Sequence, residues 1–182
     1  MKAYDYIPRY TYDDYAQWQG DWELINGYPH AMSPSPVRKH QIVYTELAVE
    51  VYNALKNERT CDDCKVFQDL DWVIDEQTVV RPDLMIVCGK FTDDFLKRPP
   101  VLAVEILSKS TSLKDRHIKY QLYETQGVRY YILVNPDTKT TEVFELVNGQ
   151  YVPNNSLTEY SFNSTCKLAF NIPAYVQQLN LD

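Results

Sequence analysis

The chain has 182 residues, of which 45% are hydrophobic and 24% are charged, and its formal net charge is −7 at pH 7. Its length and composition suit one hydrophobic core, so we expect a single domain over residues 1–182. The negative charge argues against a protein that coats nucleic acid through its overall charge. It remains compatible with a local basic cleft and with a site that collects a divalent cation.

The N-terminal part predicts a short helix, a hairpin and a long helix. Residues 11–19 read as the short helix. The Asn26-Gly27 pair lies between two short extended runs, which is a strong signal for a β-hairpin. Pro36 is suited to start a helix, and apolar residues recur at helical spacing over 37–56.

The middle of the chain is rich in extended segments. Residues 64–69 and 70–75 look like a strand pair, and 78–88 is a longer extended segment that Pro82 interrupts. The run 101–108 is apolar throughout, as in strands at the middle of a sheet, apart from one acid.

The C-terminal part continues with a helix over 112–126 and an apolar strand over 129–134, which together with the preceding strand predict a right-handed crossover. A second Asn-Gly hairpin follows over 140–152, and 166–182 predicts one more strand and a short final helix. The order predicts an α/β fold: a mixed β-sheet flanked by helices, with an N-terminal β-hairpin.

The four cysteines include one Cys-x-x-Cys, "CDDC", at Cys61 and Cys64. A zinc ribbon would need a second such pair, and a thioredoxin-like motif would follow a strand and open a helix. The two acids between the sulfurs also disfavour a thiolate. We therefore interpret these two cysteines, together with Cys88 and Cys166, as ordinary thiols.

The apolar segments also contain three charged residues: Asp83, Glu105 and Lys119. If the two strands that carry the acids are neighbours, both carboxylates converge on one point and repel unless they share a cation or a proton. A hard ion such as Mg²⁺ prefers oxygen ligands of this kind and acidifies bound water. Lys119 could then position that water and help to stabilise a negative transition state.

A structural interpretation of the same residues is equally compatible with the sequence. Glu105 could form a buried salt bridge with Lys119 or Arg81, and Asp83 could cap a turn. From the residues alone both interpretations remain open.

Four segments in order, from Trp22 to Pro136, resemble the Uma2 family, which is also called DUF820. They are "WELINGYPHAMSPSPVRKHQ", "RPDLMIV", "VLAVEILSKST" and "KDRHIKYQLYETQGVRYYILVNP". The proteins of this family are abundant in cyanobacteria and are assigned to the PD-(D/E)XK restriction-endonuclease-like superfamily. The resemblance implies a restriction-endonuclease-like core and a metal-dependent nuclease activity.

The resemblance also assigns roles to residues. It implies that Asp83 is the first metal ligand, that Glu105 is the acid of the (D/E)XK part, and that Ile106 offers its backbone carbonyl to the metal. The chain departs from the superfamily pattern at Leu107, where a lysine is usual. In the Uma2 variant a lysine of the next helix replaces it, and Lys119 fits that place.

Other residues are weaker candidates. Lys119 could be only the i,i+4 partner of Asp115 in a surface ion pair. Glu23 matches an acid of the family and could be an extra acid near the metal or a partner of a lysine. His40 could contact phosphate or carry a proton, or be structural. Glu46 lies where superfamily nucleases often carry an acid, although a solvated helix face explains it as well.

A set of scattered basic residues could form a local rim for DNA, although such residues on a helix are normally just solvated. They are Lys109, Lys114, Arg116 and Arg129. By analogy with nucleases that cut both strands of a duplex, we expect a homodimer.

Our sequence-based prediction is therefore a Mg²⁺- or Mn²⁺-dependent endonuclease that hydrolyses DNA phosphodiester bonds. The alternatives are a catalytically inactive nuclease-fold module that binds DNA or protein, and a hydrolase of small phosphorylated molecules. Because the N-terminus lacks an apolar signal segment and no run of about 18 apolar residues occurs, we expect a cytoplasmic protein with no membrane contact.

Overall fold

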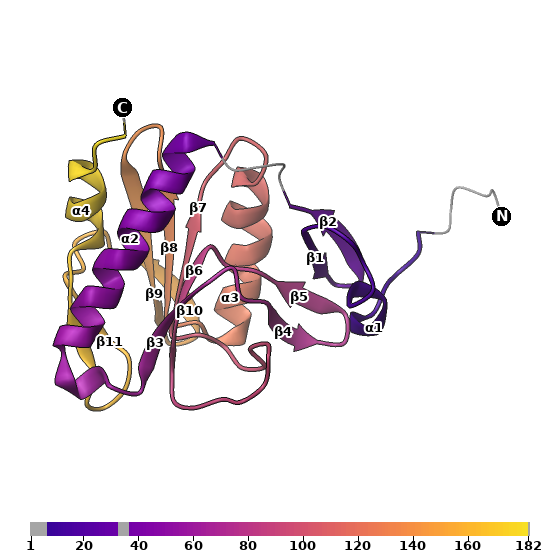
Figure 1. Cartoon of the computed structure of the whole chain (residues 1–182), viewed down its shortest axis with the longest axis horizontal. Helices are drawn as coiled ribbons and strands as arrows, with labels where there is room; N and C mark the ends of the chain where they lie inside the picture. Colours follow the sequence, from indigo (N-terminus) through magenta and orange to yellow (C-terminus); the bar gives the residue numbers. More distant parts are fainter. Residues whose placement is uncertain (1–6, 33–36, 182) are drawn as a thin grey trace.

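The computed structural model describes residues 7–32 and 37–181. Their strands form a six-stranded sheet, a four-stranded sheet and a two-stranded sheet (Figure 1). The predicted start of a helix at Pro36 lies outside the described residues. No helix of the described part is long and apolar enough to span a bilayer.

The six-stranded sheet is the centre of the molecule, with strand order β10-β9-β8-β7-β6-β3. β7 and β8 are parallel and every other neighbouring pair is antiparallel, as expected for a mixed sheet. Its strands are β3 (Cys64–Gln68), β6 (Leu84–Cys88), β7 (Leu102–Ile106), β8 (Tyr130–Asn135), β9 (Thr140–Val147) and β10 (Gln150–Pro153).

Helices cover both faces of this sheet (Figure 1). The long helix α2 (Arg38–Asn57) and the final helix α4 (Ile172–Gln178) lie on one face, and α3 (Tyr120–Gln126) lies on the other. Because strand side chains alternate, Leu84 in β6 packs into the core under α2, while its neighbour Met85 packs into the core under α3. The predicted α/β architecture is confirmed.

The N-terminal hairpin is present as predicted, with β1 (Trp22–Ile25) paired to β2 (Tyr28–Ala31). Asn26 and Gly27 both have positive φ, of 52° and 79°, as the tight turn of such a hairpin requires. The hairpin belongs to the four-stranded sheet β2-β1-β5-β4, in which β4 is Trp72–Asp75 and β5 is Thr78–Val80. The short helix α1 (Tyr12–Tyr15) precedes it.

The predicted pairing of residues 64–69 with 70–75 is wrong. β3 pairs with β6 in the large sheet, and β4 pairs with β5 in the small one. Asp69 has a φ of 49°, a left-handed conformation that turns the chain from one sheet towards the other. Strand propensity predicted both strands, but it contains no information about the sheet that each strand joins.

The helix predicted over 112–126 has an unexpected form. Residues Lys114–Lys119 are a π-helix, and the α-helix α3 continues from Tyr120. π-helical turns are rare in proteins, and where they occur they often lie at functional sites. Gly127 ends the helix with a φ of 82°, as predicted.

The C-terminal part contains the second Asn-Gly hairpin, between β9 and β10. β11 (Glu159–Ser161), which was not predicted, pairs with β12 (Lys167–Ala169). The interpretation of the cysteines as ordinary thiols is wrong, since Cys61 is bonded to Cys166 and Cys64 to Cys88. The first disulfide joins residues 105 positions apart, which no local motif could indicate.

Candidate active site

The two acids predicted to converge lie at the same end of neighbouring strands. β6 and β7 are antiparallel, with Leu84 opposite Val104. One further step in this register places Asp83, the residue before β6, opposite Glu105. Pro82 has no N–H group for a sheet ladder, which helps to explain why the chain is non-regular between β5 and β6.

Glu105 is 3% exposed and faces the helix on the α3 side. Its Oε1 accepts a hydrogen bond from Lys119 Nζ at 2.9 Å and another from the Tyr123 hydroxyl at 2.8 Å. The predicted salt bridge with Lys119 is therefore present. Arg81, the alternative partner, forms its ion pairs with Asp71 and Asp21 instead.

Lys119 is the centre of a buried ion-pair network. It is 2% exposed, and besides Glu105 it contacts Glu23 Oε1 at 2.7 Å and Asp115 Oδ1 at 3.9 Å. Lys114 forms a second ion pair with Glu23 through Oε2. Lys119 is therefore not part of a surface ion pair with Asp115 alone. Its two closer partners, Glu23 and Glu105, are buried acids on strands β1 and β7.

The network holds more carboxyl groups than ammonium groups. Glu23, Glu105 and Asp115 surround Lys114 and Lys119. Burial opposes ionisation of Glu23, but the two ammonium groups outweigh it and lower the pKa of Glu23 to about 2. Burial raises the pKa of Glu105 well above its ordinary value, and repulsion from the other acids adds to this. Burial also raises the pKa of Asp115. A proton or a further cation would therefore stabilise the network.

Asp83 lies beside this network, at the end of the sheet. Its Oδ2 accepts a hydrogen bond from the backbone N–H of Ile106 at 2.6 Å, where a neighbouring strand would otherwise supply a carbonyl. The charge of Asp83 also acts to raise the pKa of Glu105, in line with the register that places the two residues opposite each other. The two predicted acids are thus brought together, with Ile106 between them.

His40, in the first turn of α2, reaches the same place. Its Nε2 lies 3.6 Å from Asp83 Oδ2, and its side chain is 12% exposed. Burial opposes protonation, but the hydrogen bond and charge of Asp83 outweigh it and raise the pKa of His40. Its Nδ1 is buried and has no hydrogen-bond partner among the described residues.

The donor atoms fit a hard divalent ion. Within the described part of the chain, the hydrogen bonds and ion pairs of Glu105 use Oε1 and those of Asp83 use Oδ2. One oxygen of each carboxylate therefore remains for a metal. In residues 7–32 and 37–181, no three His, Cys, Asp or Glu side chains are together available as metal ligands. The site offers two carboxylates and backbone oxygen, which suits Mg²⁺, an ion that keeps several waters.

The remaining accessory candidate, Glu46, lies elsewhere. It is exposed on α2, and its carboxylate accepts a hydrogen bond from the Tyr175 hydroxyl at 3.3 Å. The geometry does not connect it to the acids of the site.

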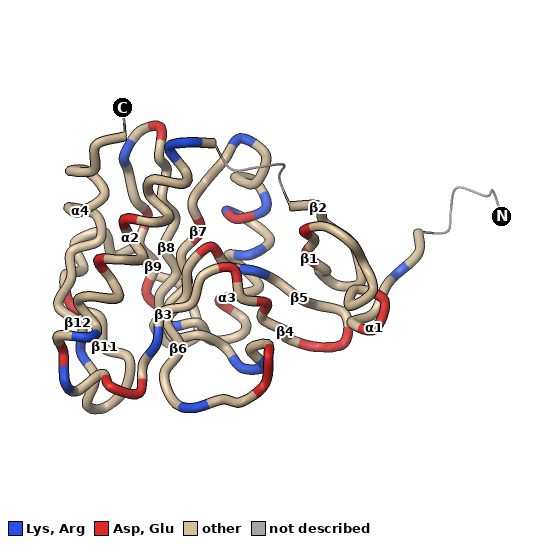
Figure 2. The backbone as a smooth tube through the Cα atoms, in the orientation of Figure 1, with Lys and Arg blue, Asp and Glu red and all other residues tan. Residues whose placement is uncertain are grey.

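The proposed basic rim is only partly open. Lys114 forms an ion pair with Glu23, and Arg116 forms one with Glu142. Lys109 and Arg129 are exposed. Figure 2 shows basic positions at the start of the helix that leads into α3, with acidic positions among and around them.

Two contributors to the site were missed as functional residues. Tyr123 follows Lys119 by four residues, and that helical spacing was the available signal for its contact with Glu105. Asp69 accepts a hydrogen bond from the Tyr44 hydroxyl at 2.5 Å, and burial raises its pKa. Its nearness to Asp83 depends on the turn between the two sheets, which no local pattern of residues indicates.

We expect Tyr123→Phe to lower the free energy of unfolding by about 1–3 kcal/mol, since it removes a donor to a buried carboxyl group. Urea unfolding followed by circular dichroism measures this difference. Tyr52→Phe is the matched control, because Tyr52 is 50% exposed and its change should be within about 0.5 kcal/mol of zero. Equal stabilities of the two variants would contradict the assigned hydrogen bond.

Comparison with known proteins identifies the family of the chain and proteins of similar fold. The family model described as "Uma2: Putative restriction endonuclease" matches residues 12–168. The fold is similar to the crystal structure of a putative nuclease belonging to DUF820 from Anabaena variabilis ATCC 29413. The TM-score is 0.69 at 17% sequence identity, over 91% of this chain and 98% of that one. A search of the curated proteins found no match. Because the family model covers most of the sequence, from the first helix to β12, the chain belongs to the Uma2 family.

Proposed function

We propose that this protein is a Mg²⁺-dependent endonuclease that hydrolyses phosphodiester bonds in DNA. One observation carries the proposal: Asp83 and Glu105 approach each other at neighbouring strand ends, beside a buried network with excess carboxyl groups. The description of the family as "Putative restriction endonuclease" and the nuclease-like fold support the same activity.

In this proposal Asp83, Glu105 and the backbone carbonyl of Ile106 would hold the metal. The ion would acidify a bound water and neutralise charge on the phosphoryl oxygens. The hydrogen bond from the Ile106 N–H fixes the Asp83 carboxylate at the strand end. His40 lies 3.6 Å from the same carboxylate and would hold or release a proton beside the metal in this proposal.

Lys119 has a positioning role in the proposal, which differs from the catalytic role expected from the sequence. At 2% exposure and with three acidic neighbours, its ammonium group has little access to a substrate. It holds Oε1 of Glu105, which leaves Oε2 for the metal.

The test is cleavage of supercoiled and linear DNA in the presence of Mg²⁺ or Mn²⁺. We expect nicked or linear products that depend on the metal and disappear when a chelator is added. The proposal fails if DNA stays intact with either metal over a wide range of enzyme concentrations. Hydrolysis of a small chromogenic phosphodiester without DNA cleavage would indicate a small-molecule hydrolase instead.

A non-enzymatic nuclease-fold module is the second candidate. The observation that favours it is the ion pair between Lys119 and Glu105, which satisfies part of the buried charge without a metal. The net charge of −7 also disfavours approach to a polyanion. Calorimetry separates the two candidates, because a module that binds no Mg²⁺ or Mn²⁺ at millimolar concentration cannot use the proposed chemistry.

By analogy with nucleases that pair by two-fold symmetry to cut both strands of a duplex, the proposal includes a homodimer. Sedimentation equilibrium measures the mass directly. A monomer at all concentrations, with or without DNA, would contradict the homodimer.

The affinity for Mg²⁺ is expected to rise with pH. Because burial raises the pKa of Glu105 well above its ordinary value, a proton competes with the metal for this carboxylate. Affinity should therefore increase as the pH rises towards that pKa, by up to about tenfold per pH unit for one displaced proton. Titration calorimetry in buffers of different pH measures the slope.

Glu105→Gln is the control for this slope. It removes the competing proton but keeps an oxygen that accepts from Lys119, so only the titration of His40 should remain. A slope that is unchanged in Glu105→Gln would show that Glu105 does not bind the ion.

A further inference from the structure

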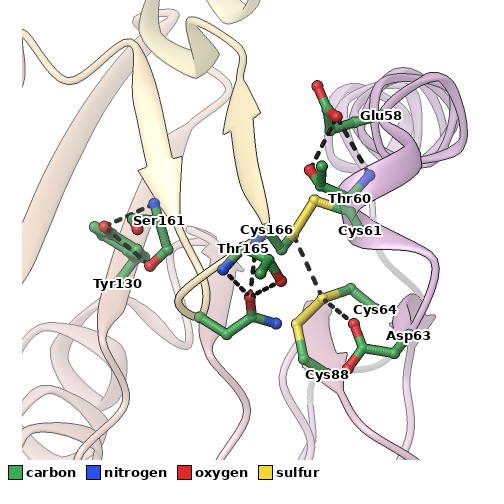
Figure 3. Close-up of a disulfide and its surroundings, with 11 residues drawn as sticks. Glu58, Thr60, Cys61, Asp63, Cys64, Cys88, Tyr130, Ser161, Thr165 and Cys166 are labelled. Atoms are coloured by element: carbon green, nitrogen blue, oxygen red, sulfur yellow. Dashed lines mark hydrogen bonds between the residues drawn. A yellow bond between two sulfur atoms is a disulfide. The ribbon is translucent and has the colours of Figure 1, made fainter.

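All four cysteines of the chain meet at one place, although they come from different parts of the sequence (Figure 3). Cys61 ends the short 3-10 helix η1 (Arg59–Cys61), Cys64 begins β3, Cys88 ends β6, and Cys166 precedes β12. They form two disulfides, Cys61–Cys166 and Cys64–Cys88, so in this oxidised state none of the four sulfurs is available to a metal.

The two disulfides lie in contact with each other. Cys64 Sγ is 3.6 Å from Cys166 Sγ, a contact that links one disulfide to the other (Figure 3). In a tetrahedral zinc site with Zn–S bonds of about 2.3 Å, neighbouring sulfurs are about 3.8 Å apart. Cys64 Sγ and Cys166 Sγ are thus already close to the separation that one shared zinc ion requires.

The backbone holds this arrangement in place without the sulfur bonds. Cys64 and Cys88 are direct partners in the antiparallel ladder of β3 and β6. Cys61 and Cys64 have the Cys-x-x-Cys spacing of a zinc knuckle, and η1 contacts both α2 and β12. The sequence contains no second Cys-x-x-Cys motif, but the fold brings Cys88 and Cys166 to the same place as a second pair of ligands.

The surroundings allow a metal and a reductant to reach the sulfurs. A cavity of about 140 Å³ opens beside Cys61 and Cys64, and Lys56 and Lys65 also line it. A zinc ion with four thiolates has a net charge of −2, which these two ammonium groups would partly offset. Asp62, which lines the same cavity, and Asp63, whose Oδ1 lies 3.7 Å from Cys64 Sγ, add negative charge there. Cys61, Cys64 and Cys166 are themselves buried, at 1%, 4% and 0% exposure, so a metal or a reductant would approach them through this cavity.

We propose that the four cysteines form a redox-dependent zinc site. A dithiol gives two electrons and two protons to each disulfide and becomes a cyclic disulfide itself. The four resulting thiols bind one Zn²⁺ as thiolates and release their protons. Hydrogen peroxide reverses the step: each peroxide takes two electrons from a thiolate pair and two protons from solvent, which gives one disulfide and two waters, and the metal leaves.

This site is separate from the candidate active site. His40 lies in the first turn of α2, and Cys61 follows the other end of the same 20-residue helix. A helix of this length spans about 30 Å. The zinc proposal therefore does not depend on the proposed nuclease activity, and either can fail alone.

The test uses Co²⁺ as a spectroscopic substitute for Zn²⁺ with the full chain. The protein is reduced with excess dithiol under anaerobic conditions, freed of dithiol and titrated with Co²⁺. We expect one ion per chain, with the visible absorption and thiolate-to-cobalt charge-transfer bands of a tetrahedral four-sulfur site. Zn²⁺ should displace the Co²⁺ and abolish the bands, and the untreated disulfide form should give none.

Two cysteine variants and one control variant assign the bands. Cys88→Ser and Cys166→Ser each leave three thiols, so the charge-transfer intensity should fall and Zn²⁺ affinity should drop at least about tenfold, with folding checked by circular dichroism. Asp83→Asn, which alters only the proposed Mg²⁺ site, should keep the full spectrum.

The proposal is overturned if the reduced, folded chain binds no Co²⁺ or Zn²⁺, or if both cysteine variants bind them as the unmodified chain does. The four residues would then be structural disulfides or unligated thiols. Peroxide treatment of the zinc-loaded protein gives a second decision, since release of one Zn²⁺ with loss of four thiols supports the redox step and retention of zinc contradicts it.

Discussion

Asp83→Asn is expected to reduce Mg²⁺-dependent DNA cleavage by at least about 100-fold. Loss of residues that only support a metal ligand already costs about 10- to 100-fold, and Asp83 is proposed as a ligand itself. Asparagine keeps an oxygen that can accept the hydrogen bond from Ile106, so the end of the strand should stay in place. Cleavage rates at saturating Mg²⁺, together with calorimetric Mg²⁺ binding, measure the effect.

The matched control is Glu46→Gln. Like Asp83→Asn, it replaces one negatively charged carboxylate with a neutral amide, but at an exposed position on α2. We expect its cleavage rate and Mg²⁺ affinity to equal those of the unmodified chain. If Asp83→Asn cleaved DNA as fast as Glu46→Gln does, Asp83 would not be a metal ligand.

Lys119→Met is expected to lower the free energy of unfolding by about 3–5 kcal/mol, the largest stability effect in the molecule that we predict. Methionine fills a similar volume, but Glu23 and Glu105 would lose their buried cation. Breaking a buried ion pair from one side leaves an uncompensated charge, which accounts for this magnitude. Urea unfolding at neutral pH measures the change.

Lys97→Met is the control for this prediction. Lys97 forms an exposed ion pair with Asp93, so its loss should cost no more than about 1 kcal/mol. A second readout separates positioning from mere stability. Without the nearby ammonium group, the pKa of Glu105 should rise further, and Mg²⁺ binding should begin at higher pH. A Lys119→Met variant as stable as Lys97→Met would contradict the buried network.

Much of the fold was predictable because it depends on local signals. The positive φ values of Asn26 and Gly27 are what an Asn-Gly turn requires, and the helical spacing over 37–56 identified α2. The apolar run over 101–108 was likewise recognised as a strand, which is β7. These features were visible because each is encoded within a few consecutive residues.

The errors concern contacts between distant residues. The segments now known as β3 and β4 join different sheets because the chain turns at Asp69, and nothing in their composition indicates this. The bond between Cys61 and Cys166 likewise depends on where the C-terminal strands pack. Pairing across such distances is a result of the whole fold.

The candidate site was predicted in its main residues but not in its charge balance. Glu105 and Lys119 form a buried ion pair, Asp83 accepts a hydrogen bond from the N–H of the residue after Glu105, and Glu23 joins through the N-terminal hairpin. The sequence could not show that Lys119 serves two acids from a buried position. That depends on helix packing, and it changes the proposed role of Lys119 from catalysis to positioning.

The most direct test of the proposed function is a crystal structure of the protein grown with Mn²⁺, with the anomalous signal of the metal used to locate it. We predict one ion bound by Asp83 and Glu105, with the Ile106 carbonyl as a third ligand and waters completing the shell. Anomalous density elsewhere, or none at this position with Glu105 still bonded only to Lys119 and Tyr123, would contradict the metal site.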